Sequence, residues 1–244
     1  MNRTYLMFDI RRTLRNKRVL LFSVLMPVVL FAIFGLTIPD GASEGGISAI
    51  AYVMVSMAMF GSMSAAMSSG GAIAAERDGG WNRTLRLTPL TPQAYVASKV
   101  ILSLLLAVPP LLIVFLFGRV AGHVHLDATQ WITVALVSWL GALPFAAIGL
   151  VIGYVAKPDS VQPITGLSTM LIAAFGGLWL PVDQMPSLMK HIAQLTPAYW
   201  TGQTSRSALT AAGVDTQALL VVLAWTVVLG VIALRRFRAD TARA

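Results

Sequence analysis

The stretch ISAIAYVMVSMAMFGSMSAAMSSGGAIAA, residues 47–75, contains no charged residue and runs directly into ERDGGWNRTLRLTPLTP, residues 76–92. A second uncharged stretch, residues 100–118, follows closely. About 20 apolar residues cross the hydrocarbon core of a bilayer as an α-helix. The two uncharged stretches are therefore predicted to be membrane spans, and the charged segment between them is predicted to lie at one membrane surface.

The same alternation continues along the whole chain of 244 residues, of which 57% are hydrophobic and 11% are charged. This composition is far from that of a soluble globular protein. Six windows are long and apolar enough to cross a membrane, namely residues 19–38, 47–75, 96–118, 131–156, 161–180 and 216–234. Because they leave little chain for a soluble domain, residues 1–244 are predicted to form a single all-α transmembrane domain with six spans.

Basic residues are distributed unevenly between the predicted loops. If the N-terminus is cytoplasmic, only Arg119, Lys190 and Arg206 among the 18 Lys and Arg residues fall in outer segments. The positive-inside rule then places both termini in the cytoplasm and the protein in the cell membrane. This asymmetry accounts for the net charge of +8, so a nucleic-acid partner is not expected.

Residues 1–18 place Leu6, Ile10 and Leu14 on one helical stripe, with most of the arginines off it. This pattern predicts an interfacial elbow helix on the inner leaflet, held by anionic membrane lipid. The alternative is a basic tail that only sets the topology. The apolar run that follows exceeds the ~7–15 residues of a cleaved signal core, and is therefore predicted to be a retained span.

Residues 181–215 form the longest segment outside the windows and are predicted to be external. Helical spacing from Met185 and Pro186 predicts one short helix, and Thr196 before a proline predicts the start of a second. An apolar stripe here faces lipid headgroups or protein, and Tyr199 and Trp200 suit the aromatic belt. The alternative is an interfacial hairpin without a gating role.

The second window is rich in methionine and small residues. Met59, Met63 and Met67 recur every four residues and so share one helical face. Methionine surfaces adapt to varied apolar ligands, which makes this face a candidate substrate contact. Gly61 and Ala65 form a small-x-x-x-small pair that lets helices approach closely, so ordinary helix packing is the alternative.

Several kinds of chemistry are missing from the sequence. No glycine-rich loop ends in Gly-Lys-Ser/Thr, so the chain is not expected to bind ATP. His123 and His125 lack a neighbouring acid cluster, and no metal site is expected. All ten acids are predicted to lie in loops or tails, whereas ion-coupled carriers usually embed one in a span. Lys99 near a helix end is expected to snorkel to the surface. The spans are therefore predicted to form a transport path, and a separate chain is predicted to supply the energy for transport.

The charged segment resembles the cytoplasmic coupling segment of type-2 ABC transporter permeases. In that family Glu-Arg-Glu/Asp-x-Gly is followed by a run of Leu and Arg that ends in Pro. Here Glu76, Arg77 and Asp78 match the first part, and residues 85–89 match the second. The sequence departs from the family pattern at Trp81-Asn82. The order of elbow helix, six spans and outer helical pair is also similar to the family, so the resemblance covers essentially the whole chain.

The resemblance implies a homo- or heterodimer of six-span permease subunits with two copies of an ABC ATPase that binds ATP and Mg. It implies export of a lipophilic or amphipathic substrate such as a drug, an antibiotic or a lipid. The first and fifth spans, with Gly166 and Gly176-Gly177, are implied subunit contacts. The implied ATPase-coupling residues are Glu76, Arg77, Asp78, Gly79, Arg83, Leu85, Arg86 and Pro89. The implied substrate path contains Met59, Met63, Met67, Phe175 and Trp179, and the external gate contains Met185, Pro186, Tyr199 and Trp200.

Three alternatives remain open from the sequence. A polysaccharide exporter permease of the same family has the same fold, although few aromatic residues are available for sugar stacking. A membrane sensor or assembly scaffold uses the charged segment only to bind a partner. A self-sufficient ion-coupled carrier needs no ATPase. Stoichiometric co-purification of an ATPase separates the permease from the last two.

Overall fold

The computed structural model describes residues 17–39, 41–44, 47–80, 92–210 and 213–243, and most of these residues are helical. In this part of the chain the β-structure is one antiparallel hairpin, β1 (Ser43–Glu44) and β2 (Ile47–Ser48). The predicted elbow helix falls on residues of which 1–16 lie outside the described ranges. Apart from this small hairpin, the described structure is mostly helical, which is consistent with the all-α prediction.

Each of the six predicted windows contains helix. In chain order the helices are α2 (Lys17–Gly35), α3 (Ala49–Met67), α4 (Gly70–Asp78), α6 (Pro92–Val120), α7 (Ala128–Leu140), α8 (Leu143–Val155), α9 (Pro158–Phe175) and α12 (Thr216–Arg243). Among the described residues, four continuous stretches are long and apolar enough to cross a membrane, namely Ala49–Asp78, Gln93–Val120, Ala128–Val155 and Thr216–Ala239, and Ser23–Gly35 is a shorter apolar helix. The protein is a multi-pass membrane protein, and the number of six spans and their orientation stay predictions.

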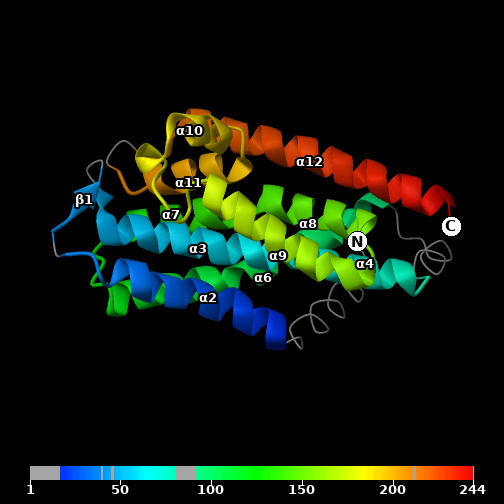
Figure 1. The fold of residues 1–244 in the computed structure, drawn as a ribbon, viewed down its shortest axis with the longest axis horizontal. Coiled ribbons are helices and arrows are strands. Elements are labelled where there is room, and N and C mark those ends of the chain that lie inside the picture. The colour runs from blue at the N-terminus through cyan, green and yellow to red at the C-terminus, as the bar shows by residue number, and fades with distance from the viewer. Residues whose placement is uncertain (1–16, 40, 45–46, 81–91, 211–212, 244) are drawn as a thin grey trace.

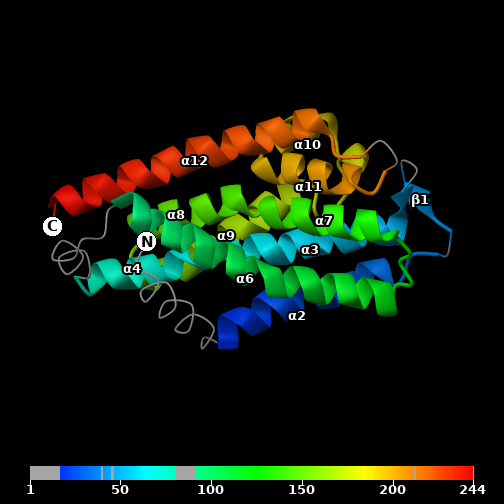
Figure 2. The same cartoon turned by 180° about the vertical axis from the view of Figure 1, so that it is seen from behind.

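The bundle is packed around α3, which α2, α6, α8 and other helices surround (Figures 1 and 2). Small residues make this packing possible, as the small-x-x-x-small pattern predicts. A Cβ added at Gly61 would lie 2.8 Å from Pro110 Cβ and 2.9 Å from Pro27 Cγ. A Cβ at Gly70 would overlap the backbone oxygen of Gly149. The second span therefore contacts α2, α6 and α8 through positions that tolerate no larger side chain.

The two ends of the bundle differ. At one end, called here the α4 end, lie α4, the turn from α8 to α9 and the C-terminal part of α12 (Figure 1). At the other, called the hairpin end, lie β1, the start of α7, and two short helices, α10 (Ser187–Gln194) and α11 (Pro197–Ser207) (Figures 1 and 2). A 3-10 turn, η1 (Val182–Gln184), precedes α10. The predicted pair of short helices before the last span is confirmed.

Local sequence accounts for where these short helices begin. Pro186 stands at the N-cap of α10. At α11 the Thr196 hydroxyl accepts a hydrogen bond from the Tyr199 backbone N–H at 3.3 Å, and proline occupies the first helical position. The apolar side chains of Leu188 and Leu195 are 72% and 74% exposed, so α10 presents an apolar face to its surroundings.

The glycines predicted at a subunit contact fall into two groups. Nothing lies within 4 Å of a Cβ added at Gly166, which is exposed on α9. At Gly176, in contrast, a Cβ would collide with Ala198 of the same chain, and Gly177 has a φ of +76° that forms the turn after α9. The prediction that Gly176-Gly177 permits close approach of a second subunit is therefore corrected, because this pair serves contacts within the chain.

Candidate functional site

The charged segment begins inside a helix. Glu76, Arg77 and Asp78 form the last turn of α4, Gly79 caps it, and Gly80 adopts a φ of +70°. This left-handed conformation favours glycine because a Cβ is strained there, so the sequence Gly-Gly ends the helix as predicted. The next described residue is Pro92, the first of α6. The predicted coupling residues Arg83, Leu85, Arg86 and Pro89 lie outside the described residues.

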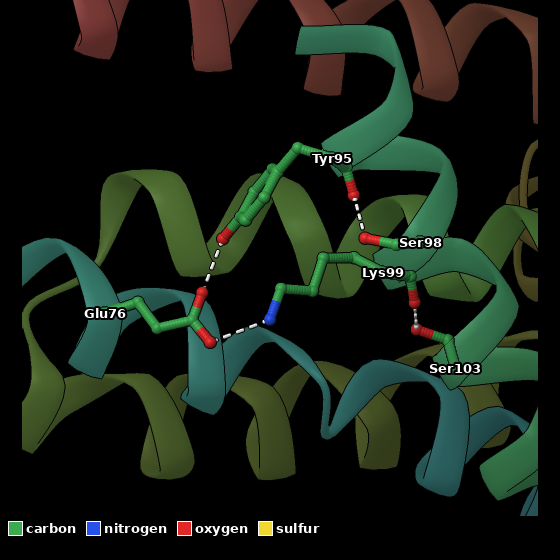
Figure 3. Close-up of polar contacts among 5 residues, drawn as sticks. All are labelled: Glu76, Tyr95, Ser98, Lys99 and Ser103. Carbon is green, nitrogen blue, oxygen red and sulfur yellow. Dashed lines mark hydrogen bonds and ion pairs between the residues drawn. The ribbon is translucent and has the colours of Figure 1, made fainter. Parts of the chain in front are cut away.

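Glu76 is buried, with 8% of its surface exposed. One carboxylate oxygen, Oε1, lies 2.8 Å from Nζ of Lys99, and the other, Oε2, accepts a hydrogen bond of 2.6 Å from the hydroxyl of Tyr95 (Figure 3). Both partners belong to α6 and are four residues apart, so they project from the same face of that helix. The expectation that every acid lies in a loop or tail is wrong for Glu76, because a buried carboxylate is tolerable when it is paired on both oxygens.

Lys99 contradicts the expectation that it snorkels to the surface. Its side chain is 0% exposed and points at Glu76 rather than toward water (Figure 3). Its Nζ also lies 5.3 Å from the centre of the Tyr95 ring. The opposite charge on Glu76 and the face of the ring compensate for the water that the ammonium group loses, which removes the reason for snorkelling.

A polar seam continues from this ion pair along the interface of α3 and α4 with α6. Ser103 Oγ lies 2.7 Å from Ser69 Oγ and 2.8 Å from the backbone oxygen of Lys99. Farther along, the Ser62 hydroxyl donates a hydrogen bond of 3.1 Å to the backbone oxygen of Ala107. Ser62, Ser69 and Glu76 recur every seven residues, which keeps them on one side of the helix. The seam fixes the register of the second span against α6.

Arg77 points to a different neighbour. Its guanidinium donates from Nη1 to the backbone oxygens of Gly153 and Ala156, at 3.2 and 3.4 Å. These carbonyls belong to the C-terminal end of α8, where they lack intrahelical partners and where the helix dipole favours a cation. Successive residues of a helix project about 100° apart. Glu76 therefore holds α4 to α6 while Arg77 holds it to α8.

An aromatic contact extends the site to the last helix. The Tyr95 ring stacks on Phe237 of α12, with centroids 5.2 Å apart and planes at 25°. Tyr154 of α8 contacts the ring of Phe237 edge-on, with centroids 5.9 Å apart. Phe237 is 4% exposed. The cluster of Glu76, Lys99, Tyr95, Phe237 and Tyr154, called here the α4-end junction, thus joins four helices.

The sequence singled out only part of this junction. Glu76 was predicted to meet the polar groups of an ATPase, but its carboxylate faces the interior of its own chain, so direct docking by this side chain does not fit its burial. Asp78 and Gly79 are exposed. The coupling role of residues 76–92 remains a prediction. Tyr95 and Phe237 were missed, although the spacing of Tyr95 and Lys99 beside an acidic helix end could have indicated a shared partner.

The methionines of the predicted substrate path are buried. Met59, Met63 and Met67 are each 0% exposed and belong to the main core of the chain. The Ser205 hydroxyl donates to the sulfur of Met59 at 3.4 Å, and the Thr169 hydroxyl donates to that of Met67 at 3.4 Å. These contacts within one chain are those that ordinary helix packing predicts. Their role toward a substrate stays a prediction.

The remaining path residues lie beside this core. Trp179 packs edge-to-face against Phe60, with ring centroids 5.4 Å apart. Phe175 ends α9 and is partly buried. The structure therefore places Trp179 against the methionine-containing core, and Phe175 at the end of α9.

The predicted gate residues gather around α10 and α11. The Trp200 indole donates a hydrogen bond of 2.7 Å to the backbone oxygen of Gln194, which joins the end of α10 to α11. Tyr199 and Trp200 meet edge-on with centroids 5.1 Å apart. Met185 is buried, and Pro186 is exposed at the start of α10. The structure brings these residues to one region, and their gating role stays a prediction.

Comparison with known proteins identifies the family of the chain. Residues 2–210 match the family described as ABC-2 type transporter. The chain is also similar to "Putative transport permease YvfS" of Bacillus subtilis (strain 168), with 33% identity over 199 residues that cover 80% of this chain and 79% of that protein. The family match includes the α4-end junction except Phe237, together with the short helices at the hairpin end. This chain therefore belongs to the ABC-2 type transporter family.

Proposed function

We propose that this chain is the transmembrane permease subunit of an ATP-driven exporter whose ATP hydrolysis takes place on a separate ABC ATPase. Family membership gives the general role of a transport permease. The observation that carries the rest is the anchoring of residues 76–92. This charged segment joins two long apolar helices in the sequence, and buried contacts tie Glu76 and Arg77 at its start to α6 and α8, and Tyr95 shortly after it to α12. A segment held in this way can pass an external push to the spans.

The proposed orientation puts the α4 end in the cytoplasm. Basic residues at this end support it, namely Arg77, Lys157, Arg235, Arg236 and Arg238. Lys190 and Arg206, in contrast, belong to the short helices at the hairpin end. The C-terminal part of α12 also lies at the α4 end (Figure 1). The positive-inside rule then makes this end cytoplasmic and the hairpin end external.

The proposed assembly has two permease subunits and two ATPase subunits, with ATP and Mg bound by the ATPases. Support for a second permease comes from exposed apolar side chains on α2 and α9, including Leu25, Ile33, Leu167 and Met170. Exposed apolar patches mark contacts with protein or lipid. Gly166 lies on this part of α9 with open space around it. Homodimer and heterodimer both fit these faces.

A lipophilic or amphipathic cargo, such as a drug, an antibiotic or a lipid, suits the apolar spans. The polysaccharide branch of the same family is the alternative. A flexible, apolar core of methionine favours the first class, whereas sugar binding usually relies on exposed aromatic surfaces. Direct comparison of lipid-soluble dyes with labelled oligosaccharides in reconstituted vesicles distinguishes the two classes.

The buried Glu76 raises the rival of an ion-coupled carrier, since such proteins embed acids in their spans. Its geometry argues against that role. Both carboxylate oxygens are engaged, one by an ammonium group and one by a phenol, and Glu76 lies in the last turn of α4. A relay group must exchange protons or ions with water, whereas this one is locked in a structural contact.

The test is affinity purification of the tagged chain from its native membranes, followed by reconstitution. We expect an ABC ATPase to co-purify in equal proportion and to drive dye accumulation in inside-out vesicles only when ATP is added. Transport by the chain alone under a proton or sodium gradient would establish the carrier instead. Purification without any ATPase, under conditions that preserve the permease fold, would contradict the proposal.

A further inference from the structure

We propose that the Glu76–Lys99–Tyr95 contact and Phe237 form a transmission element that passes displacement of residues 81–91 to α12. This inference rests on the proposed function because it takes the partner ATPase as the source of the displacement. Lys99, Tyr95 and Phe237 are positioning residues here, since they act on the spans rather than on a substrate.

The first step is that the two ends of the charged segment are joined to each other. Glu76 precedes the segment and Lys99 follows it, and they form an ion pair of 2.8 Å that is shielded from solvent. Because the pair is buried, solvent does not replace a lost partner, and breaking the pair leaves an uncompensated charge in the interior. The ends of α4 and α6 therefore move together when the segment moves.

The second step is that Tyr95 carries two contacts at once. Its hydroxyl donates to Glu76 at 2.6 Å, and its ring stacks on Phe237 at 5.2 Å. The hydrogen bond fixes the direction of the ring, and the ring fixes Phe237 (Figure 3 shows the polar half of this contact). A tilt of α4 relative to α6 would therefore move Tyr95, and Tyr95 would move Phe237 in the C-terminal part of α12.

The third step is that Phe237 anchors the C-terminal part of α12, a helix that also packs along α8 and α11. The described side chains of α12 that are buried are Ala218, Val222, Ala233 and Phe237. Phe237 is the largest of these, and Tyr154 of α8 closes its other side. Movement of this ring is therefore expected to move the C-terminal part of α12 with it.

The experiment uses the permease purified with its ATPase in lipid nanodiscs. Hydrogen–deuterium exchange is followed in peptides from residues 81–91 and 230–239, without nucleotide and with ATP plus orthovanadate. The variants are Tyr95→Phe, which removes one hydroxyl and keeps the ring, and Phe237→Leu, which removes the stacked ring without touching a charge. Ser62→Ala is the matched control, because it removes one hydroxyl from the same helix interface farther along.

In the wild type we expect nucleotide to change exchange in both regions by about twofold or more. Both test variants should keep the response of residues 81–91 and lose at least half of the response of residues 230–239, whereas Ser62→Ala should keep both. A merely structural role would raise exchange in every state without separating the two regions. An undiminished response of α12 in both variants would overturn the inference.

The outcome for the wild type separates this inference from the proposed function. If nucleotide alters residues 81–91 but not α12, the transmission route is wrong and the permease role stands. If no ATPase is bound and neither region responds, the proposed function itself fails. Should Tyr95→Phe fail to accumulate, Phe237→Leu gives the same comparison without disturbing the ion pair.

Discussion

Glu76 on α4 and Lys99 on α6 bridge these two helices, with 2.8 Å between Oε1 and Nζ and side chains that are 7% and 0% exposed. The pair lies at the base of the charged segment that was predicted to meet an ATPase. Because Glu76 is buried, the acid at the head of the motif joins α4 to α6 within the chain.

The first prediction concerns the cost of breaking this pair. Lys99→Met leaves the carboxylate of Glu76 buried without its cation and should destabilise the protein by about 3–5 kcal/mol. The double variant Glu76→Gln with Lys99→Met removes both charges and should recover most of that loss. Thermal unfolding of the purified permease in one detergent measures both. Lys157→Met, at an exposed position in the turn before α9, is the control and should change stability little. Equal stability of the single and double variants would show that the pair is not coupled.

The second prediction concerns topology. The chain has no cysteine, so a single introduced cysteine reports its own position. His125→Cys and Asp183→Cys, both at exposed positions toward the hairpin end, should react with a membrane-impermeant maleimide in intact cells. Asp159→Cys and Arg236→Cys, at the α4 end, should react only after permeabilisation. The reverse labelling pattern would show that the α4 end is external, so the charged segment would not be cytoplasmic.

The sequence predicted the helices well and the junction poorly, for a physical reason. Apolar run length decides where a span lies, and it is a local property that needs no knowledge of neighbours. The partner of a buried charge is not local. Lys99 was predicted to snorkel because a lysine near a helix end usually does, and only the folded structure shows that its side chain reaches the carboxylate of Glu76 on α4.

The close helix contacts were likewise predictable in part, because their presence is a local property and their partners are not. Glycines and small residues in the second span predicted close approach, and the structure confirms it at Gly61. Which glycine meets which helix could not be predicted. Gly176 serves a contact with Ala198 of the same chain, while the sequence pattern alone equally suits a contact with a second subunit.

The third prediction tests this packing. Gly70→Ala places a methyl group against the backbone oxygen of Gly149, and backbone cannot yield as a flexible side chain does. Overpacking of this kind typically costs 1–3 kcal/mol, so we expect a loss of roughly 2 kcal/mol. Gly230→Ala is the matched control, because nothing lies within 4 Å of a Cβ there, and it should be neutral or slightly stabilising in a helix. Unfolding in detergent compares the two, and equal behaviour would contradict the tight crossing of α4 and α8.

The last prediction separates an internal clamp from a docking surface. Glu76→Lys sets two ammonium groups against each other in the interior and should reduce both membrane level and ATPase association. If Glu76 acts through Lys99, adding Lys99→Glu restores an ion pair of opposite direction and should recover much of both. If Glu76 docks the ATPase directly, its reversed charge still opposes the partner, and Lys99→Glu cannot rescue association.

Asp78→Lys supplies the matched comparison, since Asp78 is exposed in the same helical turn. It should leave the membrane level unchanged, and any loss of ATPase association would then report on docking alone. The four chains are compared by immunoblot of membranes and by the amount of ATPase that co-purifies. Failure of the swapped pair to exceed the Glu76→Lys single variant in both measurements would reject the clamp. If the swapped pair recovers both measurements and Asp78→Lys is impaired only in ATPase association, Glu76 stabilises the fold and Asp78 contacts the ATPase.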